Sequence, residues 1–223
     1  MPQEQTATLA ARLWLQIALV YGALEGALWT LHTTRAFWSG AAMGLIVAFS
    51  LAERQFWPKL GIEPRRIRYG WWIAPGGLGL GLLIILIGRE LGTAHRLFGP
   101  KVIYWHVLGY AVWALAQEFI AQSFFFLRFE QILQSAPKAI AANALLFGAA
   151  HIPNPVLVPV TLAGGAVLSA LFYRYRSIYT LAVAHILVAL SLAVTVPSPT
   201  LHNMRVGIGY VRFHPAPARQ TKQ

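Results

Sequence analysis

Long runs of apolar residues, separated by short polar segments, make up most of this chain. A helix needs about 20 residues to cross a bilayer, and proline residues in the polar segments mark breaks between helices. On this pattern we predict seven membrane-spanning helices, at about residues 11–31, 36–52, 70–88, 102–127, 138–151, 155–173 and 177–196. The pattern therefore predicts an all-α membrane protein, a polytopic bundle of about seven (six to eight) transmembrane helices.

Four segments depart from a simple crossing helix. The run 138–151 is short, which indicates a tilted or partly re-entrant helix, and 102–127 is long enough to tilt or to extend past the interface. Pro75, Gly76 and Gly77 fall inside the third run and predict a kink or an interfacial start there. An eighth short or re-entrant element at 200–211 (TLHNMRVGIGYV) is an alternative that the sequence leaves open.

Composition supports a membrane protein. The 223 residues are 57% hydrophobic and only 11% charged, whereas a soluble domain carries about 25% charged residues. We therefore expect a single integral membrane domain over 1–223, without an appended soluble domain. The first apolar run is full length and lacks a basic segment ahead of it, which favours a retained helix over a cleaved signal peptide.

The distribution of positive charge predicts the orientation. The net charge is +11, and the most basic short loop is 53–69, with Arg54, Lys59, Arg65, Arg66 and Arg68. The positive-inside rule places this loop and the N-terminus in the cytoplasm, and we expect the bacterial inner (plasma) membrane. Because the charges lie between apolar runs, we expect them to contact a bilayer with anionic head groups. We expect no nucleic-acid partner.

Residue types that are absent exclude several kinds of site. The chain has no Cys, which removes thiol nucleophiles and thiolate metal sites, and it has no Asp, which removes an aspartate-pair protease and a Ser-His-Asp triad. The zinc motif HExxH and the GxSG motif of rhomboid-type serine proteases do not occur either.

Three ionisable residues lie inside apolar runs: Glu118, His151 and His185. A charged side chain at the bilayer centre costs about 2.5–3.5 kcal/mol on insertion scales, so such residues usually face the bundle interior and find partners there. We therefore expect the three side chains to share one cavity near mid-membrane. A shared site bridged by water requires the two imidazoles to lie within about 12 Å of each other.

Residues at helical spacing surround each of the three. The sequence reads QEFIAQ at 117–122, FGAAH at 147–151 and HILVA at 185–189, so the supporting residues are Gln117, Gln122, Phe147, Asn143 and Ala189. This order and spacing resemble the CPBP family of intramembrane endopeptidases (CAAX protease and bacteriocin-processing, Abi; CAAX prenyl protease 2-like), whose motifs are EExxxR, FxxxH and HxxxN or HxxxD. The resemblance covers about 102–190, within a motif-bearing core of about 102–196.

The motifs depart from the family at three positions. Gln117 replaces the leading Glu, Gln122 replaces the Arg, and Ala189 replaces the Asn or Asp. The resemblance implies that the leading Glu and the FxxxH histidine activate a water, while the later His and Asn stabilise the oxyanion. Glu118 matches the second Glu of the pair, and it can take over the role of base only if the helix is turned by part of a residue step.

The favoured hypothesis is an intramembrane endopeptidase in which Glu118, His151 and His185 are catalytic and a glutamate-activated water cleaves a peptide bond of a membrane protein or peptide. A catalytically lapsed relative acting as a membrane scaffold or binding protein is the first alternative, and a small proton-coupled transporter is the second. We expect no cofactor. The alternative is a zinc ion held by the same Glu and two His.

Overall fold

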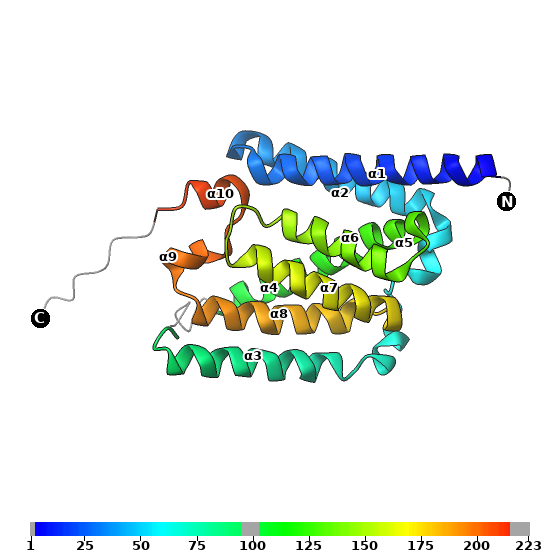
Figure 1. Cartoon of the computed structure of the whole chain (residues 1–223). Coiled ribbons are helices and arrows are strands. Elements are labelled where there is room, and N and C mark those ends of the chain that lie inside the picture. Colours follow the sequence, from blue (N-terminus) through cyan, green and yellow to red (C-terminus); the bar gives the residue numbers. More distant parts are fainter. Residues whose placement is uncertain (1–2, 95–102, 215–223) are drawn as a thin grey trace, which may run out of the picture.

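The computed structural model describes residues 3–94 and 103–214, and every regular element in these ranges is helical (Figure 1). The longer helices are α1 (Gln3–Trp29), α2 (His32–Ala52), α3 (Ile73–Glu90), α4 (Ile103–Glu118), α6 (Ala136–Ala149), α7 (Leu157–Tyr175) and α8 (Ile178–Thr195). The shorter elements are η1 (Arg54–Lys59), η2 (Pro64–Tyr69), η3 (Phe119–Phe126), α5 (Leu127–Leu133), α9 (Ser198–Leu201), η4 (His202–Met204) and α10 (Gly207–Val211).

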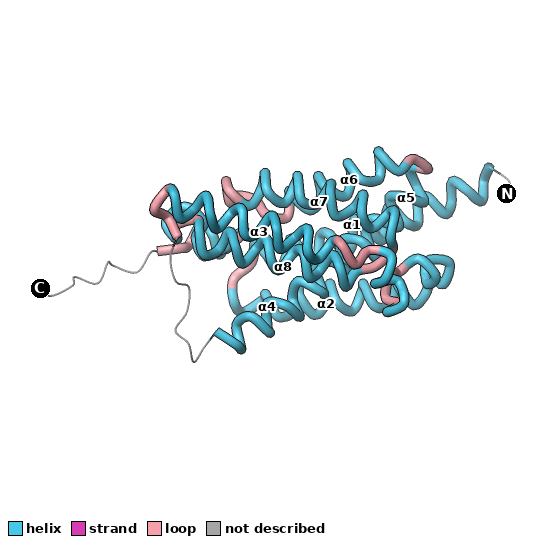
Figure 2. Tube along the Cα trace, turned by 90° about the horizontal axis from the view of Figure 1, so that it is seen from below, coloured by secondary structure: helices cyan, strands magenta, loops and turns pink. Residues whose placement is uncertain are grey.

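The long helices run side by side as a bundle. α1 packs along α2 at one side, α6 packs along α7 in the middle, and α8 contacts both α4 and α3. Figures 1 and 2 show α3 as the outermost helix on the side opposite to α1. The element α8 is therefore covered on more than one side, and a residue at its centre lies inside the bundle.

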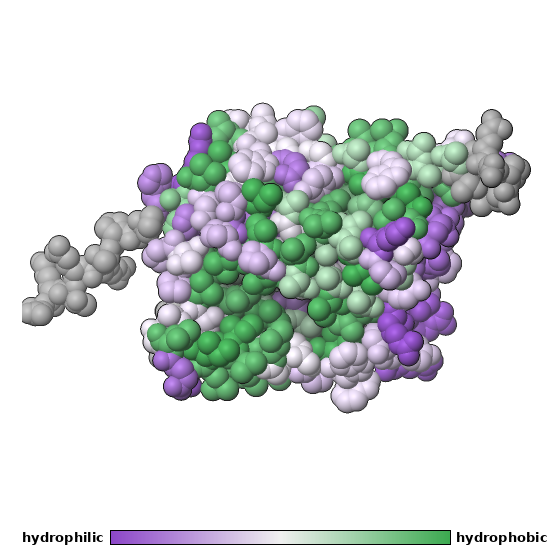
Figure 3. Space-filling model, in the orientation of Figure 1, coloured by the Kyte–Doolittle hydropathy of each residue, from purple (hydrophilic) through white to green (hydrophobic). Residues whose placement is uncertain are grey.

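Five helices among the described residues are long and apolar enough to cross a membrane: Ala7–Trp29 within α1, α2, α3, α7 and α8. Large apolar side chains on α3, such as Leu80, Leu82 and Leu86, remain about half exposed, and Figure 3 shows hydrophobic surface along the length of the bundle. In water such surface would be unstable, but lipid solvates it. The protein is an integral membrane protein, and the predicted all-α polytopic bundle is confirmed.

The predicted short and long runs have clear structural counterparts. α6 has 14 residues and spans only about 21 Å at 1.5 Å per residue, less than the hydrocarbon core. The predicted run 102–127 corresponds to α4, η3 and α5, which follow one another without a break from Ile103 to Leu133. α3 begins at Ile73, so Pro75 lies in its first turn, where a missing N–H is tolerated. Of the two expectations for this segment, the structure therefore shows a helix start and not a kink within a longer helix.

The segment 200–211, which the sequence left open as an eighth element, is structured but too short to cross. Residues 198–211 form α9, η4 and α10, of four, three and five residues. Gly207 has φ +55°, and a Cβ there would lie within 2.3 Å of the carbonyl oxygen of Leu28. Only glycine allows α10 to approach α1 this closely. The segment is thus held against the bundle as a strap.

A buried polar network ties α1 to the end of α2 and to α5. Glu53 accepts hydrogen bonds from Arg12 Nη2 (2.9 Å) and Gln16 Nε2 (2.7 Å), and Gln16 Oε1 accepts one from Arg128 Nε (2.9 Å). Arg128 is 1% exposed and its guanidinium lies 3.6 Å from the centre of the Phe124 ring. Arg128 Nη1 also donates to the carbonyl oxygen of Phe124 (2.9 Å), and the ion pair of the network joins Glu53 to Arg12, so the network connects α1, α2 and α5 at the end of the bundle that carries η1 and η2.

Candidate active site

Glu118 and His185 meet inside the bundle. The Glu118 Oε1 atom lies 2.7 Å from His185 Nδ1, and the two side chains are 1% and 13% exposed. Glu118 is the last residue of α4 and His185 lies near the middle of α8, so the contact joins two helices that are packed together. Two of the three ionisable residues predicted from the sequence are therefore in direct contact.

The helix that carries Glu118 changes its winding at that residue. η3 is a π-helix of eight residues, Phe119–Phe126, inserted between α4 and α5. π-helical turns are rare and are frequent at functional sites, because the wider turn changes which side chains face a partner helix. Here Glu118 is buried and contacts His185, whereas Gln117 is half-buried. The inward-facing position of the motif is the one that holds the carboxylate.

The second oxygen of Glu118 begins a chain of polar contacts across three further elements. Gln122 Nε2 donates to Glu118 Oε2 (3.3 Å), and Asn143 Nδ2 donates to Gln122 Oε1 (3.5 Å) and to Ser169 Oγ (2.8 Å). Gln122, Asn143 and Ser169 are all buried. Gln122 and Asn143, both named from the sequence as supporting residues, therefore lie in one chain of contacts with Glu118. Ser169 was not predicted, since the run GAVLSA at 165–170 indicated only close helix packing.

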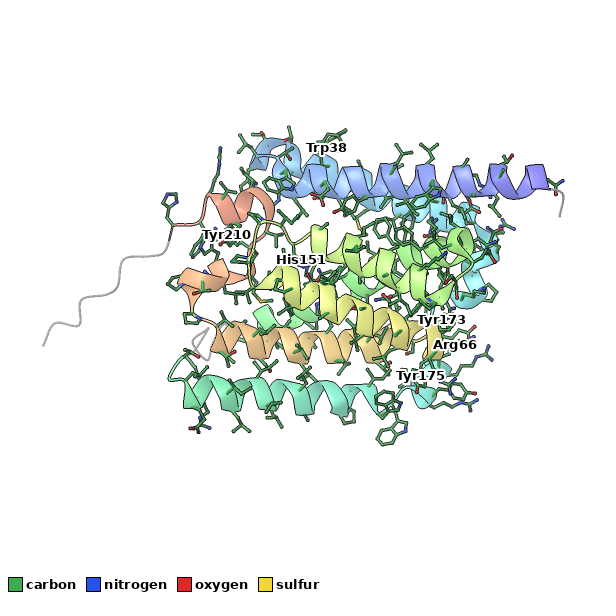
Figure 4. The ribbon with its side chains drawn as sticks, in the orientation of Figure 1. Trp38, Arg66, His151, Tyr173, Tyr175 and Tyr210 are labelled. Carbon is green, nitrogen blue, oxygen red and sulfur yellow. The ribbon has the colours of Figure 1, made fainter. Side chains whose placement is uncertain are left out.

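His151 approaches the pair from the end of α6. Its Nδ1 atom lies 2.7 Å from the carbonyl oxygen of Phe147, one turn earlier. The Phe147 ring contacts both imidazoles, with centroids 4.9 Å from His151 and 6.2 Å from His185. These two distances bound the separation of the imidazoles below the about 12 Å that a shared site allows. Figure 4 shows His151 where α6 ends, inside the bundle.

The hydrogen bonds fix the tautomer of both histidines. The carbonyl of Phe147 can only accept, and the carboxylate of Glu118 in its ionised form can only accept, so Nδ1 carries a proton in each ring. A neutral imidazole then presents an unprotonated Nε2 on its other side. The arrangement of Glu118 and His185 is that of a carboxylate that orients a histidine base.

The three residues that depart from the family motifs, Gln117, Gln122 and Ala189, lie in different surroundings. Gln122 takes part in the polar chain described above, and Gln117 makes no side-chain hydrogen bond to another described residue. Ala189 is buried on α8, one turn after His185, and it offers no donor where the family motif has Asn or Asp. Any oxyanion donor in this part of the bundle must therefore come from another residue.

Two expectations from the sequence concern the surroundings of Glu118, His151 and His185: a shared cavity and, as an alternative, a zinc site. Among residues 3–94 and 103–214, no three His or Glu side chains gather closely enough to hold a metal ion. His151 makes no hydrogen bond to Glu118 or His185 in this arrangement. A cavity of about 230 Å³ lies elsewhere, between α3 and α8, and its lining is almost wholly apolar, including Leu78, Leu82, Leu187 and Val194.

The loop after His151 is tied to the strap. Asn154 is fully buried, and its Nδ2 donates to the carbonyl oxygens of Leu201 (2.9 Å) and Arg205 (3.1 Å). Its Oδ1 accepts from the backbone N–H groups of Val156 and Leu157 at the start of α7. The backbone N–H of Gly207 also donates to Ile152 O (2.9 Å). The Asn154 side chain therefore caps α7 and anchors the loop that follows His151.

Replacing Asn154 with Ala is expected to lower the free energy of unfolding by about 2–3 kcal/mol, because it leaves two carbonyls and two N–H groups without their partner. Thermal unfolding in detergent measures this. Asn154→Asp keeps the acceptor for α7 but loses both donors, so protease cleavage within 198–211 should rise in both variants. An Asp variant as resistant as the wild type would show that the bonds to the strap do not hold it.

A comparison with known protein families gives a match for the part of the chain that contains the candidate site. Residues 99–191 match the family model for type II CAAX prenyl endopeptidase Rce1-like proteins. The matched range contains Glu118, His151 and His185 with their flanking motifs, so the family resemblance inferred from the motifs is confirmed over these residues. No curated protein and no solved structure matched the chain.

Proposed function

We propose that this protein is an intramembrane endopeptidase of the CPBP/CAAX protease type, which hydrolyses a peptide bond of a membrane protein or membrane-associated peptide. The observation that carries this proposal is the 2.7 Å contact between Glu118 and His185, buried inside the bundle, with His151 across the Phe147 ring. Peptide hydrolysis needs a base for the water and a donor for the oxyanion, and Glu118 together with His185 offers the base.

The geometry favours a base made of two residues. Glu118 orients His185 through Nδ1, and His185 Nε2 takes a proton from the attacking water, while the carboxylate stabilises the imidazolium that forms. The water oxygen adds to the scissile carbonyl carbon, and the same proton then passes to the leaving amine. His151 is assigned to hold the water through its unprotonated Nε2, which accepts a hydrogen bond from it, while the donor to the oxyanion comes from another group. No cofactor takes part in this scheme.

Activity is tested directly with the purified full chain in detergent and fluorogenic peptides. A farnesylated CAAX peptide is the first probe, because the matched family model is named for that substrate, and unprenylated hydrophobic peptides are the second. Cleavage that is unchanged by a chelator supports the proposal. Inhibition that is reversed by added zinc would instead favour the Glu and two-His metal site.

A second candidate function is favoured by Gln117 and Ala189, which replace motif residues. On this hypothesis the chain is a lapsed relative that binds a membrane protein without cleaving it. Gln117→Glu restores the leading carboxylate of the motif and separates the two candidates. An inactive wild type that gains cleavage through this change supports the lapsed relative. An active wild type that Gln117→Glu does not improve supports the endopeptidase.

We also propose that η1, η2 and the N-terminus face the cytoplasm of a bacterial cell, because the loop 53–69 carries five Lys and Arg residues. The chain has no Cys, so a cysteine introduced at the exposed Arg65 is the only thiol. It should resist an impermeant thiol reagent in intact cells and react after lysis. A cysteine at Arg89, at the other end of α3, should react in intact cells. The reverse pattern would invert the topology.

A further inference from the structure

The loop between α2 and α3 folds into η1 and η2, which place cations and aromatic rings together on the surface. Arg54, Lys59, Arg65 and Arg68 are exposed. Both neighbouring helices are long and apolar enough to cross a membrane, so the loop lies where the bilayer meets water. Figure 3 shows hydrophilic surface gathered at this end of the bundle, and Figure 4 labels Arg66 there.

Both carboxylates of this segment already have partners. Glu53 is buried and bonded to Arg12 and Gln16. Glu63 accepts from Arg65 Nε (2.9 Å) and Arg66 Nε (3.3 Å), and the hydrogen bond from Arg65 holds the pKa of Glu63 below its usual value. Glu63 is therefore ionised at neutral pH and occupied by these two arginines.

Three cations remain without a carboxylate among the described residues: Arg54, Lys59 and Arg68. The Arg54 guanidinium lies 5.6 Å from the Trp57 ring centre, and that of Arg68 lies 4.6 Å from the Tyr69 ring centre. Arg68 Nη2 also donates to the Tyr69 hydroxyl (2.5 Å), and the remaining N–H groups of each guanidinium form part of the planar fork that matches phosphate oxygens. These two side chains are therefore ordered before any anion arrives.

Exposed aromatic rings accompany the cations. Trp57, Tyr69, Trp71 and Trp72 are 45%, 54%, 64% and 43% exposed. Trp and Tyr are enriched at the level of lipid head groups, where an apolar ring with a polar edge is most stable. The rings favour a lipid surface over a free ion or an acidic peptide, neither of which would solvate four large exposed rings.

We infer that η1 and η2 form a docking surface for anionic phospholipid head groups, in which Arg54, Lys59 and Arg68 contact the phosphate groups while the flanking tryptophans enter the interface. This surface is independent of catalysis at Glu118, so its test does not depend on the proposed activity. Each Lys or Arg near an anionic membrane surface contributes about a fivefold preference.

The test uses the purified full chain, phosphatidylglycerol and phosphatidylcholine, with bound lipid counted by native mass spectrometry. We expect the wild type to retain phosphatidylglycerol at least about tenfold better than phosphatidylcholine. The triple variant Arg54→Gln, Lys59→Gln, Arg68→Gln should reduce this preference to within about twofold. All three residues are exposed, and an unchanged melting temperature checks that the variant is folded.

A control that removes two positive charges elsewhere separates the effect of this surface from that of the net charge of the protein. Arg89 and Arg212 are exposed, and they lie in the last turn of α3 and directly after α10. Figure 1 shows these ends of α3 and α10 at the opposite end of the bundle from η1 and η2. The double variant Arg89→Gln, Arg212→Gln should keep the preference for phosphatidylglycerol. A wild type that binds both lipids equally, a triple variant that keeps its preference, or a control that loses it would each overturn the inference.

Discussion

Replacing Glu118 with Gln is expected to lower the rate of peptide cleavage by about 10²–10⁴-fold while the protein remains folded. The amide has the shape of the carboxylate and can still bond to His185, but it carries no negative charge to stabilise the imidazolium. The rate is measured with the peptide that the wild type cleaves best, and folding is measured by thermal unfolding in the same detergent.

A double-variant cycle tests whether Glu118 and His185 act as one base. His185→Ala should lose about as much rate as Glu118→Gln, and the double variant should lose no more, because residues that act as a unit are not additive. Glu25→Gln is the matched control. Glu25 is also a glutamate within a predicted span, and its carboxylate bonds to Trp29 on the same helix. Full activity in Glu118→Gln would remove this residue from the mechanism.

Gly77→Val is expected to destabilise the protein by about 1–3 kcal/mol and to reduce cleavage as well. A Cβ atom at Gly77 would lie 2.6 Å from the Cα of Ala184, which immediately precedes His185. Because the contact is with backbone, α8 itself must move. A displacement of about 1 Å in a catalytic group can cost 10²-fold in rate. Thermal unfolding and the cleavage rate are measured together.

Gly79 provides a control two residues away on α3. A Cβ atom at Gly79 would meet no heavy atom within 4 Å, so Gly79→Val should change stability by no more than about 0.5 kcal/mol. If the two variants behave alike, the close packing of α3 on α8 does not hold His185 in place.

Much of the fold was predictable because each crossing helix is a continuous apolar run. Proline also marked several helix starts correctly, as at Pro137 in the first turn of α6. The π-helix was not predictable, since apolar residues occupy six of the eight positions of the run FIAQSFFF at 119–126, and their spacing does not distinguish a turn of 3.6 residues from a wider one. Tertiary contacts of Phe124, Phe125 and Phe126, all fully buried, select the winding.

The ionisable residues of the candidate site were predictable from the sequence, and its neutral polar residues were less so. Glu118, His151 and His185 stand out because a membrane interior penalises ionisable groups that lack partners. Ser169 and Asn154 carry no charge, and their spacing alone matches ordinary helix packing and a loop. For Asn154 the sequence did hold a weak indication, because Asn followed by Pro155 favours a turn that precedes a helix. The partners of its amide lie 47 and 51 residues away, and no local pattern shows them.

The strap also has a consequence for how the protein is made. Residues 198–211 are translated after every helix that carries Glu118, His151 and His185, yet they supply the carbonyl groups that Asn154 binds and the N–H that Ile152 accepts. While the ribosome still holds this segment in its exit tunnel, the nascent chain has a complete set of candidate residues and an unanchored loop beside His151. The loop beside His151 therefore gains its anchor only after this segment has left the tunnel.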